Sequence, residues 1–228
     1  MSNPGLLCRL GGVLILCAAV AGCAPDAGTA GAADDLPLGA GFDFYVLALS
    51  WSPSYCAAEG DDANRQQCAS GRAHGFVVHG LWPQFERGYP ENCATNQPLE
   101  VRRDVLGGLY DIIPSAGLIR HQWRKHGSCA GLSQQDYFDV LRAARDRVQV
   151  PADYERVEES LTVDPDAVEA AFVAANPGLP PDGIAVTCDR SLLREVRICL
   201  TKTLDFRGCR EVDRRMCRLT ATELPASH

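Results

Sequence analysis

Strand-like patterns of hydrophobic residues stand near both ends of the chain. The segment Phe42–Trp51 (FDFYVLALSW) is apolar and rich in β-forming residues, and Pro53 ends it, which predicts a central strand. His74–Leu81 has a second, shorter strand pattern that ends at Trp82–Pro83. Residues 183–205 turn strand-like again, with apolar positions alternating with polar ones and cysteine. The chain therefore has strands early and late.

Helical patterns occupy the region between these strands. Leu99–Ile113 has helical spacing and ends before Pro114. Ser133–Val148 is a clearer helix, because its first residue can cap it and an apolar stripe follows. A third helix is predicted to begin at Asp164–Pro165 and to stop at Asn176–Pro177. This order of elements favours an α+β domain.

The first residues have the layout of an export signal. One positive charge, Arg9, precedes the apolar stretch Leu10–Ala21, which is shorter than the roughly 18 residues that a membrane-spanning helix needs. Val20-Ala21-Gly22-Cys23 resembles a bacterial lipobox, in which Cys23 would be lipidated and become the mature N-terminus. An ordinary secretory signal that is cut nearby is the alternative. Under either interpretation the mature chain is exported.

The rest of the chain is predicted to contain one folded domain. Residues 1–22 would be the signal peptide. Residues 23–41, rich in Ala, Gly, Asp and Pro, cannot bury enough apolar surface to fold and are expected to form a flexible tether. Residues 42–219 would form the domain, whose size requires no second core, and residues 220–228 would form a tail.

Composition and charge exclude several classes of protein. Of the 228 residues, 46% are hydrophobic and 22% are charged, which is typical of a globular chain and not of a disordered one. No later apolar run approaches the length of a membrane span, so a polytopic membrane protein is excluded. The net charge of −7 excludes a basic coat protein that holds nucleic acid by bulk charge.

The 11 cysteines are too many for a typical cytosolic enzyme. Cys8 and Cys17 lie in the predicted signal, and Cys23 is the candidate lipidation site. A zinc site is possible for the others, but the chain has no Cys-x-x-Cys pair. An even number of cysteines in an exported chain instead predicts four disulfides. The eight cysteines concerned are Cys56, Cys68, Cys93, Cys129, Cys188, Cys199, Cys209 and Cys217.

Two short segments hold three of the five histidines in unusual surroundings. In His79-Gly80-Leu81-Trp82-Pro83-Gln84, a titratable imidazole stands at a strand end beside a large flat ring. This pair suits a site that combines proton transfer with a planar ligand. The alternative is a histidine and a tryptophan that only pack in the core.

The second segment is His121-Gln122-Trp123-Arg124-Lys125-His126-Gly127-Ser128-Cys129. If it is helical, Gln122 and His126 share one face, and His121 and Lys125 form a second pair about 100° further round the axis. The alternative is a solvated cationic face that happens to be rich in histidine. The spacing lacks the His-Glu-x-x-His pattern of zinc proteases, and we predict no metal site.

Two imidazoles, a cation and an aromatic ring suit the cleavage of a phosphodiester by a neighbouring hydroxyl group. One imidazole would take the proton of a ribose 2′-hydroxyl, the other would protonate the departing 5′-oxygen, and the ammonium would stabilise the charge on phosphorus. The reaction requires a 2′-hydroxyl, so RNA qualifies as the substrate and DNA does not. It requires no cofactor.

Together the two segments resemble the active-site segments of the ribonuclease T2 family, a family of exported acid endoribonucleases. Phe42–Cys56 also resembles the first strand of that family, and the resemblance extends to Cys217. It implies an α+β domain in which helices pack against an antiparallel sheet. It also implies the disulfides Cys56–Cys68, Cys93–Cys129, Cys188–Cys217 and Cys199–Cys209.

The resemblance gives each residue of the two segments a role. His79 would be the general acid and His126 the general base. Lys125 would stabilise the pentavalent phosphorus, His121 would help to hold the phosphate, and Trp82 would stack on a base. The implied activity is metal-independent cleavage of single-stranded RNA with low base specificity, which leaves 2′,3′-cyclic phosphate ends.

One residue departs from the family pattern, because Gln122 stands where the family usually has Glu. Gln cannot ionise and can polarise a phosphate only through its amide hydrogens. Loss of one such stabilising group can reduce the rate by roughly 10²–10³. We therefore expect an active enzyme that is slower or has a shifted pH optimum.

Two other functions are retained as alternatives. The first is an RNA-binding or toxin-like relative whose catalysis Gln122 has weakened. The second is a redox or metal protein built on the cysteines and histidines. We expect the protein to be a monomer that is periplasmic, anchored at the outer membrane through Cys23, or secreted.

Overall fold

The computed structural model describes Met1, residues 36–69 and residues 71–227. Apart from Met1, the predicted signal peptide, Cys23 and most of the predicted tether lie outside the described residues.

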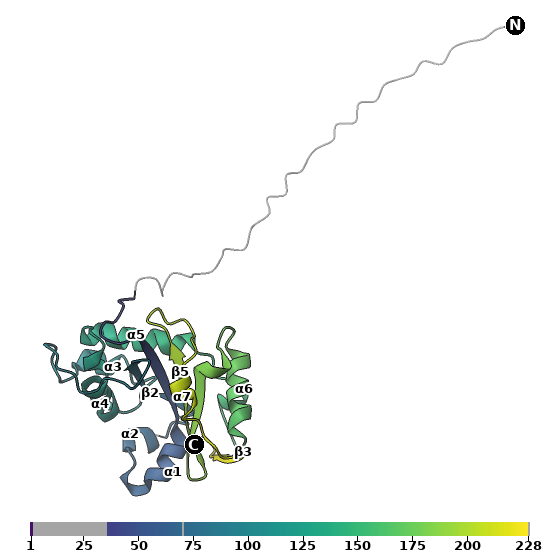
Figure 1. Ribbon diagram of the computed structural model, residues 1–228. Coiled ribbons are helices and arrows are strands. Elements are labelled where there is room, and N and C mark those ends of the chain that lie inside the picture. Colours follow the sequence, from purple (N-terminus) through teal and green to yellow (C-terminus); the bar gives the residue numbers. More distant parts are fainter. Residues whose placement is uncertain (2–35, 70, 228) are drawn as a thin grey trace. The chain divides into compact units, whose positions relative to one another are not determined.

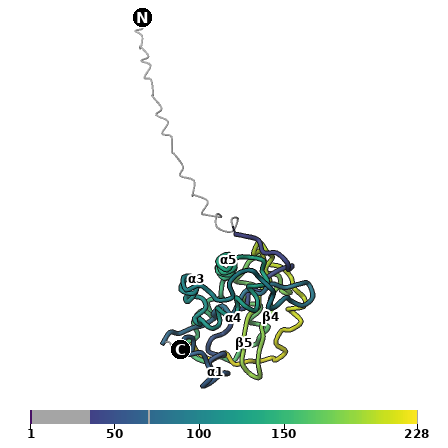
Figure 2. Tube along the Cα trace, turned by 90° about the vertical axis from the view of Figure 1, so that its left-hand side faces the viewer, coloured from purple at the N-terminus to yellow at the C-terminus, as the bar shows by residue number. Residues whose placement is uncertain are grey.

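A six-stranded sheet runs through the described domain (Figure 1). Its strands are β1 (Phe44–Trp51), β2 (Phe76–Gln84), β3 (Leu161–Val163), β4 (Ile184–Asp189), β5 (Leu192–Leu200) and β6 (Thr222–Leu224). The order is β2-β1-β5-β6-β3, and β4 pairs with β5 outside this path. Figure 2 shows β4 and β5 side by side. Neighbouring strands are antiparallel except β5 and β6, which meet in parallel at Leu192 and Glu223.

Helices cover the strands, which confirms the predicted α+β class. The helices are α1 (Ser52–Glu59), α2 (Arg65–Cys68), α3 (Arg103–Gly107), α4 (Ala116–Lys125), α5 (Gln134–Arg147), α6 (Pro165–Ala175) and α7 (Arg210–Asp213). Short 3₁₀ turns occupy Gly60–Asp62, Gly127–Cys129, Ala152–Tyr154 and Pro181–Gly183. Helices α4 and α5 contact β2, whereas α6 contacts β4. None of the described helices combines the length and the apolar character that a membrane span requires.

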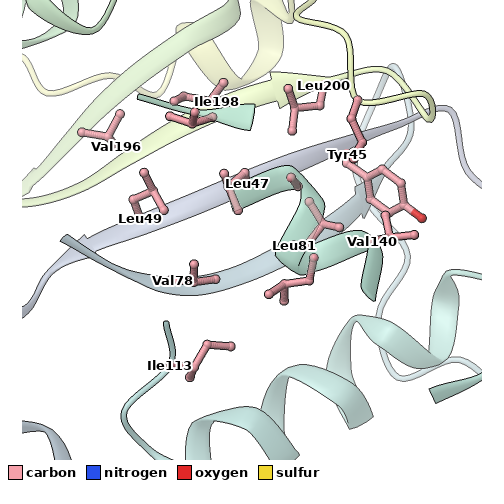
Figure 3. Close-up of a cluster of buried hydrophobic side chains, with 14 of the residues drawn as sticks. Tyr45, Leu47, Leu49, Val78, Leu81, Ile113, Val140, Val196, Ile198 and Leu200 are labelled. Atoms are coloured by element: carbon pink, nitrogen blue, oxygen red, sulfur yellow. The ribbon is translucent and has the colours of Figure 1, made fainter. Parts of the chain in front are cut away.

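The two faces of the sheet have different roles. On one face, alternate residues of β1, β2 and β5 are buried against the helices and form the main core (Figure 3). They include Tyr45, Leu47, Leu49, Val78, Leu81, Val196, Ile198 and Leu200. The other face carries only a small apolar cluster around Phe44 and Val46, against which Trp82 packs. This second face has room for polar side chains.

The ends of the longer helices follow the sequence pattern. The hydroxyl of Ser133 caps α5 by accepting a hydrogen bond from the Asp136 N–H at 3.2 Å, and Asp164 caps α6 in the same way. After α6, the buried Asn176 side chain donates from Nδ2 to the Gln149 and Phe172 carbonyls, both at 2.8 Å. Its Oδ1 accepts from the Gln149 N–H at 2.8 Å. Asn176 therefore ties the end of α6 to the segment after α5.

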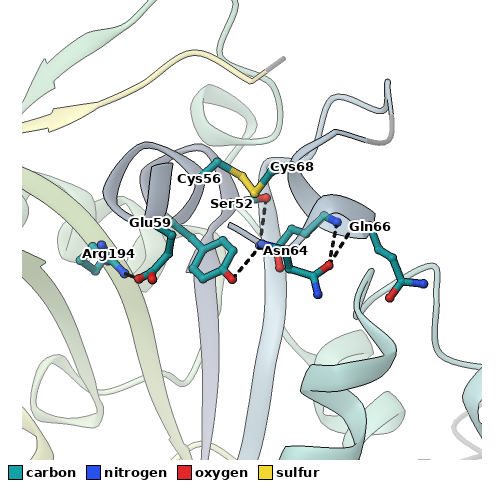
Figure 4. Close-up of a disulfide and its surroundings, with 9 residues drawn as sticks. Ser52, Cys56, Glu59, Asn64, Gln66, Cys68 and Arg194 are labelled. Atoms are coloured by element: carbon teal, nitrogen blue, oxygen red, sulfur yellow. Dashed lines mark hydrogen bonds and ion pairs between the residues drawn. A yellow bond between two sulfur atoms is a disulfide. The ribbon is translucent and has the colours of Figure 1, made fainter. Parts of the chain in front are cut away.

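The four disulfides implied by the family resemblance are all present: Cys56–Cys68, Cys93–Cys129, Cys188–Cys217 and Cys199–Cys209. Figure 4 shows Cys56–Cys68, which joins α1 to α2. Nearby, Oδ1 of Asn64 caps α2 by accepting from the Gln66 and Gln67 N–H groups at 3.0 and 3.3 Å. Four disulfides indicate an exported protein that folds in an oxidising compartment.

Two predicted elements have different lengths in the structure. Within Leu99–Ile113 only α3 is helical, because Gly107 is followed by Gly108 and two glycines disfavour continuation of a helix. The predicted second strand is β2, which continues through Pro83 to Gln84. Proline is tolerated there because β2 lies at the edge of the sheet.

The predicted tail, residues 220–228, instead contributes a strand to the sheet. Its strand β6 pairs with β3, and Leu224 is buried. The carbonyl of Pro225 accepts a hydrogen bond from the indole N–H of Trp51 at 2.9 Å. At the other end, Leu36 packs against the core, and the Ala40 N–H donates to the Ala130 carbonyl at 2.9 Å. The last residues of the predicted tether thus lie on the domain.

Candidate active site

His79 stands at an irregularity in the pairing of β2 with β1. Gly80 pairs with Ala48, and Val78 pairs with Leu49, so β2 holds one extra residue at this point. Such a β-bulge redirects a side chain and is common beside active sites. The bulge keeps Val78 in the main core while His79 contacts residues on the other face of the sheet.

Helix α4 carries the second motif to the same face. Ile119 and Trp123 anchor the helix in the main core. The neighbouring helix residues His121, Gln122 and Lys125 line a cleft together with the strand residues of the first motif. His126 is the C-cap residue, and its N–H donates to the Gln122 carbonyl at 2.9 Å. The Cys93–Cys129 disulfide then holds the following 3₁₀ turn.

The cleft has a volume of about 310 Å³ and gathers every residue that the sequence assigned to the site. These residues are His79, Trp82, His121, Gln122, Lys125 and His126. Phe85, Tyr89, Arg197 and Arg215 also line it. Among the residues that the structure describes, no group of three His, Cys, Asp or Glu side chains could hold a metal ion.

Trp82 lies against both candidate catalytic histidines. The centre of its ring system is 5.3 Å from the His79 ring centre and 5.4 Å from the His126 ring centre. Its indole N–H donates to Oε1 of Gln122 at 2.8 Å, and the guanidinium of Arg197 lies 5.2 Å from the ring centre. Trp82 is therefore a wall of the site as well as a surface on which a base could stack.

The two histidines have opposite environments. Nδ1 of His79 contacts Oε1 of Glu195, and about a third of the side chain is exposed. His126 is only 7% exposed, and its Nδ1 is buried without a hydrogen-bond partner. Burial, together with the nearby charges of Lys125, His79 and His121, lowers the pKa of His126 to about 3. His126 is therefore neutral at neutral pH, with Nε2 as the ring nitrogen that can reach a ligand.

Glu195 is ionised in spite of its burial. Burial alone would raise the pKa of its carboxyl group, but hydrogen bonds and charge from His79 and Arg197 outweigh burial and lower this pKa to about 2. Arg197 donates to Oε2 of Glu195 from Nε at 2.9 Å and from Nη2 at 2.7 Å. The site thus contains a permanent carboxylate directly behind one imidazole.

The phosphate-binding candidates lie at the helix side of the cleft. Burial, together with the charges of Lys125, His79 and Arg124, lowers the pKa of His121. Nζ of Lys125 is 3.4 Å from Oε2 of Glu91, so this cation already has an acidic neighbour. A phosphate group that binds Lys125 must compete with that carboxylate.

A second cavity, of about 410 Å³, lies on the other side of His79. His79 lines both cavities, and Glu195 lines only the second one. The second cavity also contains polar side chains from the α1–α2 region, part of which is drawn in Figure 4: Tyr55, Glu59, Asn64 and Gln67.

Sequence reasoning missed several charged residues of this site, among them Glu91, Glu195 and Arg197. The alternation along β5 places Glu195 and Arg197 on the same face, but nothing in the sequence shows that this face meets His79. Glu91 lies two residues before Cys93, and the disulfide from Cys93 to Cys129 indicates that its loop lies near the second motif.

Comparison with known proteins identifies the family. The model of the "Ribonuclease T2 family" matches residues 42–209. The chain belongs to the ribonuclease T2 family. It is 39% identical over 176 residues to a ribonuclease of Aeromonas hydrophila, which covers 71% of this chain and 73% of that protein. It is 31% identical over 139 residues to ribonuclease I of Escherichia coli, covering 44% of this chain and 52% of that protein.

Solved structures of this family share the fold. An RNase-related protein from Calystegia sepium superposes with a TM-score of 0.65 at 19% identity, covering 83% of this chain and 100% of that one. RNase NT in complex with 5′-AMP superposes with a TM-score of 0.60 at 22% identity, covering 81% and 98%. As a T2 ribonuclease with these ribonuclease relatives, the chain is an endoribonuclease.

Proposed function

We propose that this endoribonuclease cleaves single-stranded RNA without a metal ion, by transfer of the phosphoryl group to the neighbouring 2′-hydroxyl. The products are a 2′,3′-cyclic phosphate and a free 5′-hydroxyl. The observation that carries the proposal is that two imidazoles in opposite environments lie against one indole ring. One imidazole is buried and neutral, and the other is backed by a carboxylate.

His126 is the base of the proposed reaction. A neutral imidazole has a free lone pair, and the low pKa of about 3 keeps His126 in this form through the mildly acidic range. Its Nε2 takes the proton of the 2′-hydroxyl as the oxygen attacks phosphorus. His79 is the acid, which gives a proton from Nε2 to the departing 5′-oxygen.

The remaining residues hold the phosphate and the bases. Lys125 and His121 bind the non-bridging oxygens and stabilise the charge that develops there. Oε1 of Gln122 accepts from the Trp82 indole, so the amide hydrogens of Gln122 are the groups that it can offer to the phosphate. Aromatic side chains in the cleft stack on a base, which favours low base specificity because every base has a flat face.

Two further properties belong to this proposal. RNA with a base in each cavity beside His79 is the substrate, in keeping with the similar structure of RNase NT, which is a complex with 5′-AMP. The enzyme acts as a monomer, because a single chain supplies all the residues named above. Lipidation of Cys23 and anchoring at the outer membrane stay predictions from the sequence.

The test is cleavage of a homogeneous RNA in excess EDTA by the wild type, His79→Ala, His126→Ala and the control His74→Ala. His74 lies outside the cleft, near the Cys56–Cys68 disulfide. We expect full activity in EDTA, losses of roughly 10²–10⁴ for the two cleft variants and wild-type activity for the control. Activity that EDTA abolishes would overturn the proposal, as would a fully active variant at either cleft histidine. RNA binding with no turnover by the wild type would favour the weakened relative.

A further inference from the structure

Glu195 has both carboxylate oxygens engaged, although the proposed reaction gives it no direct role. Its Oε1 contacts Nδ1 of His79 and accepts from the hydroxyl of Ser50 at 3.3 Å. Its Oε2 accepts both hydrogen bonds from Arg197. The residue is 8% exposed, so this carboxylate is held at a fixed position inside the protein.

The sheet registers bring these groups together. Ser50 pairs with Glu195 and Ala48 pairs with Arg197 across β1 and β5. The β-bulge on β2 falls opposite the step from Ala48 to Leu49 on β1, which lies between these two positions. His79 therefore reaches across β1 to a carboxylate that stands two strands away. A regular β2 without the bulge would not present an extra residue at this point.

A permanent carboxylate at Nδ1 determines what the imidazole can do. An anion can only accept at this position, so Nδ1 keeps its hydrogen in both charge states of the ring. The proton that is exchanged with a ligand must then be on Nε2. The contact also fixes the rotation of a ring that is about one-third exposed and would otherwise be free to turn.

Arg197 prevents the carboxylate from turning away. If Arg197 were absent, Oε2 of Glu195 would be buried without its partner, which is unfavourable for an anion. The guanidinium also lies over Trp82, so the same residue contacts the wall of the cleft. His126 has no corresponding partner, because its Nδ1 is buried and unpaired. Of the two imidazoles, only that of His79 has a partner that fixes its Nδ1.

We propose that Glu195, held by Arg197, is a positioning residue that fixes the orientation and tautomer of His79 so that Nε2 delivers the proton to the leaving oxygen. This inference rests on the proposed role of His79 as the general acid. Glu195 does not touch the reacting atoms. Its contribution is specific to the departure of the leaving group and not to the attack by the 2′-hydroxyl.

A pair of substrates tests this distinction. A uridylyl-adenosine dinucleotide has a poor leaving group that needs a proton, whereas uridine 3′-(4-nitrophenyl phosphate) releases a stable phenolate that does not. For His79→Ala we expect a large loss on the dinucleotide and a small one on the aryl ester. For Glu195→Ala we expect the same pattern, with a roughly 10–100-fold lower kcat on the dinucleotide and little change in KM. Glu195→Gln should recover part of this loss, because its amide oxygen can accept from Nδ1.

Asp111→Ala is the matched control, because it also removes a carboxylate that pairs with an arginine. Asp111 lies outside the cleft, and its Oδ1 is 2.7 Å from Nη2 of Arg142. It should leave both substrates unaffected. Suppose that His79→Ala loses more activity on the dinucleotide than on the aryl ester, as expected. If Glu195→Ala and Glu195→Gln then lose equal activity on the two substrates, the positioning role alone is overturned. Equal losses for His79→Ala would overturn the acid role and the proposed function with it.

Discussion

Gly80 is the position at which a single added methyl group should damage the site most directly. It stands on β2 between His79 and the Trp82–Gln122 hydrogen bond. A Cβ atom at Gly80 would overlap Oε1 of Gln122 and would lie 2.5 Å from Nε1 of Trp82. We therefore expect Gly80→Ala to separate the indole from the amide.

The size of the effect follows from how little the neighbours can move. Gln122 is 1% exposed, and β2 is held by its pairing with β1. Breaking the partly buried 2.8 Å hydrogen bond costs about 1–3 kcal/mol, and overpacking adds about 1–3 kcal/mol. The free energy of unfolding should fall by about 2–6 kcal/mol. A displacement of catalytic groups by about 1 Å can lower the rate by about 10²-fold.

Thermal unfolding followed by circular dichroism and the rate of RNA cleavage measure these two effects. Gly107→Ala is the matched control, because an added Cβ there has nothing within 4 Å and the residue ends α3. It should keep full activity and lose no stability. If Gly80→Ala melts at the wild-type temperature and cleaves RNA at the wild-type rate, the close contact between Trp82 and Gln122 does not exist in solution.

Three other changes should alter stability and not chemistry. Burial raises the pKa of Glu169 from 4.5 to about 7, so the stability that this group contributes is complete below pH 4.5 and is lost as the pH rises through 7. Glu169→Gln should therefore stabilise the protein at pH 8, by on the order of 1–2 kcal/mol, and not at pH 4.5, as measured by urea unfolding at both pH values. Asn176→Ala should lower the free energy of unfolding by about 1–3 kcal/mol, also by urea unfolding, with KM for RNA unchanged. Deletion of residues 220–228 removes β6 and should lower the melting temperature; an unchanged melting temperature would restore the view that this segment is only a tail.

The sequence was most informative where one local rule decides the structure. A run of apolar, β-forming residues predicts β1, and alternation of apolar residues predicts β5. Ser133 and Asp164 mark the starts of α5 and α6 because capping depends on adjacent residues. The histidine motifs could be located for the same reason. Each motif is continuous in the chain: the first lies at the end of the strand β2, and the second lies on the helix α4 and its C-cap.

The parts that could not be predicted depend on long-range register. The contact of His79 with Glu195 joins residues 116 positions apart and requires a bulge in β2. The strand β6 is short, and its pairing with β3 is what makes it a strand. Leu99–Ile113 has buried apolar residues at helical spacing, but its glycines end the helix early while tertiary packing still buries Leu109 and Ile113.

The central claim, attack by the 2′-hydroxyl between two imidazoles, is tested most directly with an RNA oligonucleotide that carries one 2′-deoxynucleotide. The enzyme should digest it in EDTA, and mass spectrometry with ³¹P NMR of the early products should show 2′,3′-cyclic phosphate at every cut and no cut on the 3′ side of the deoxynucleotide. A cut at that position, or linear phosphate ends formed without a cyclic intermediate, would contradict the mechanism.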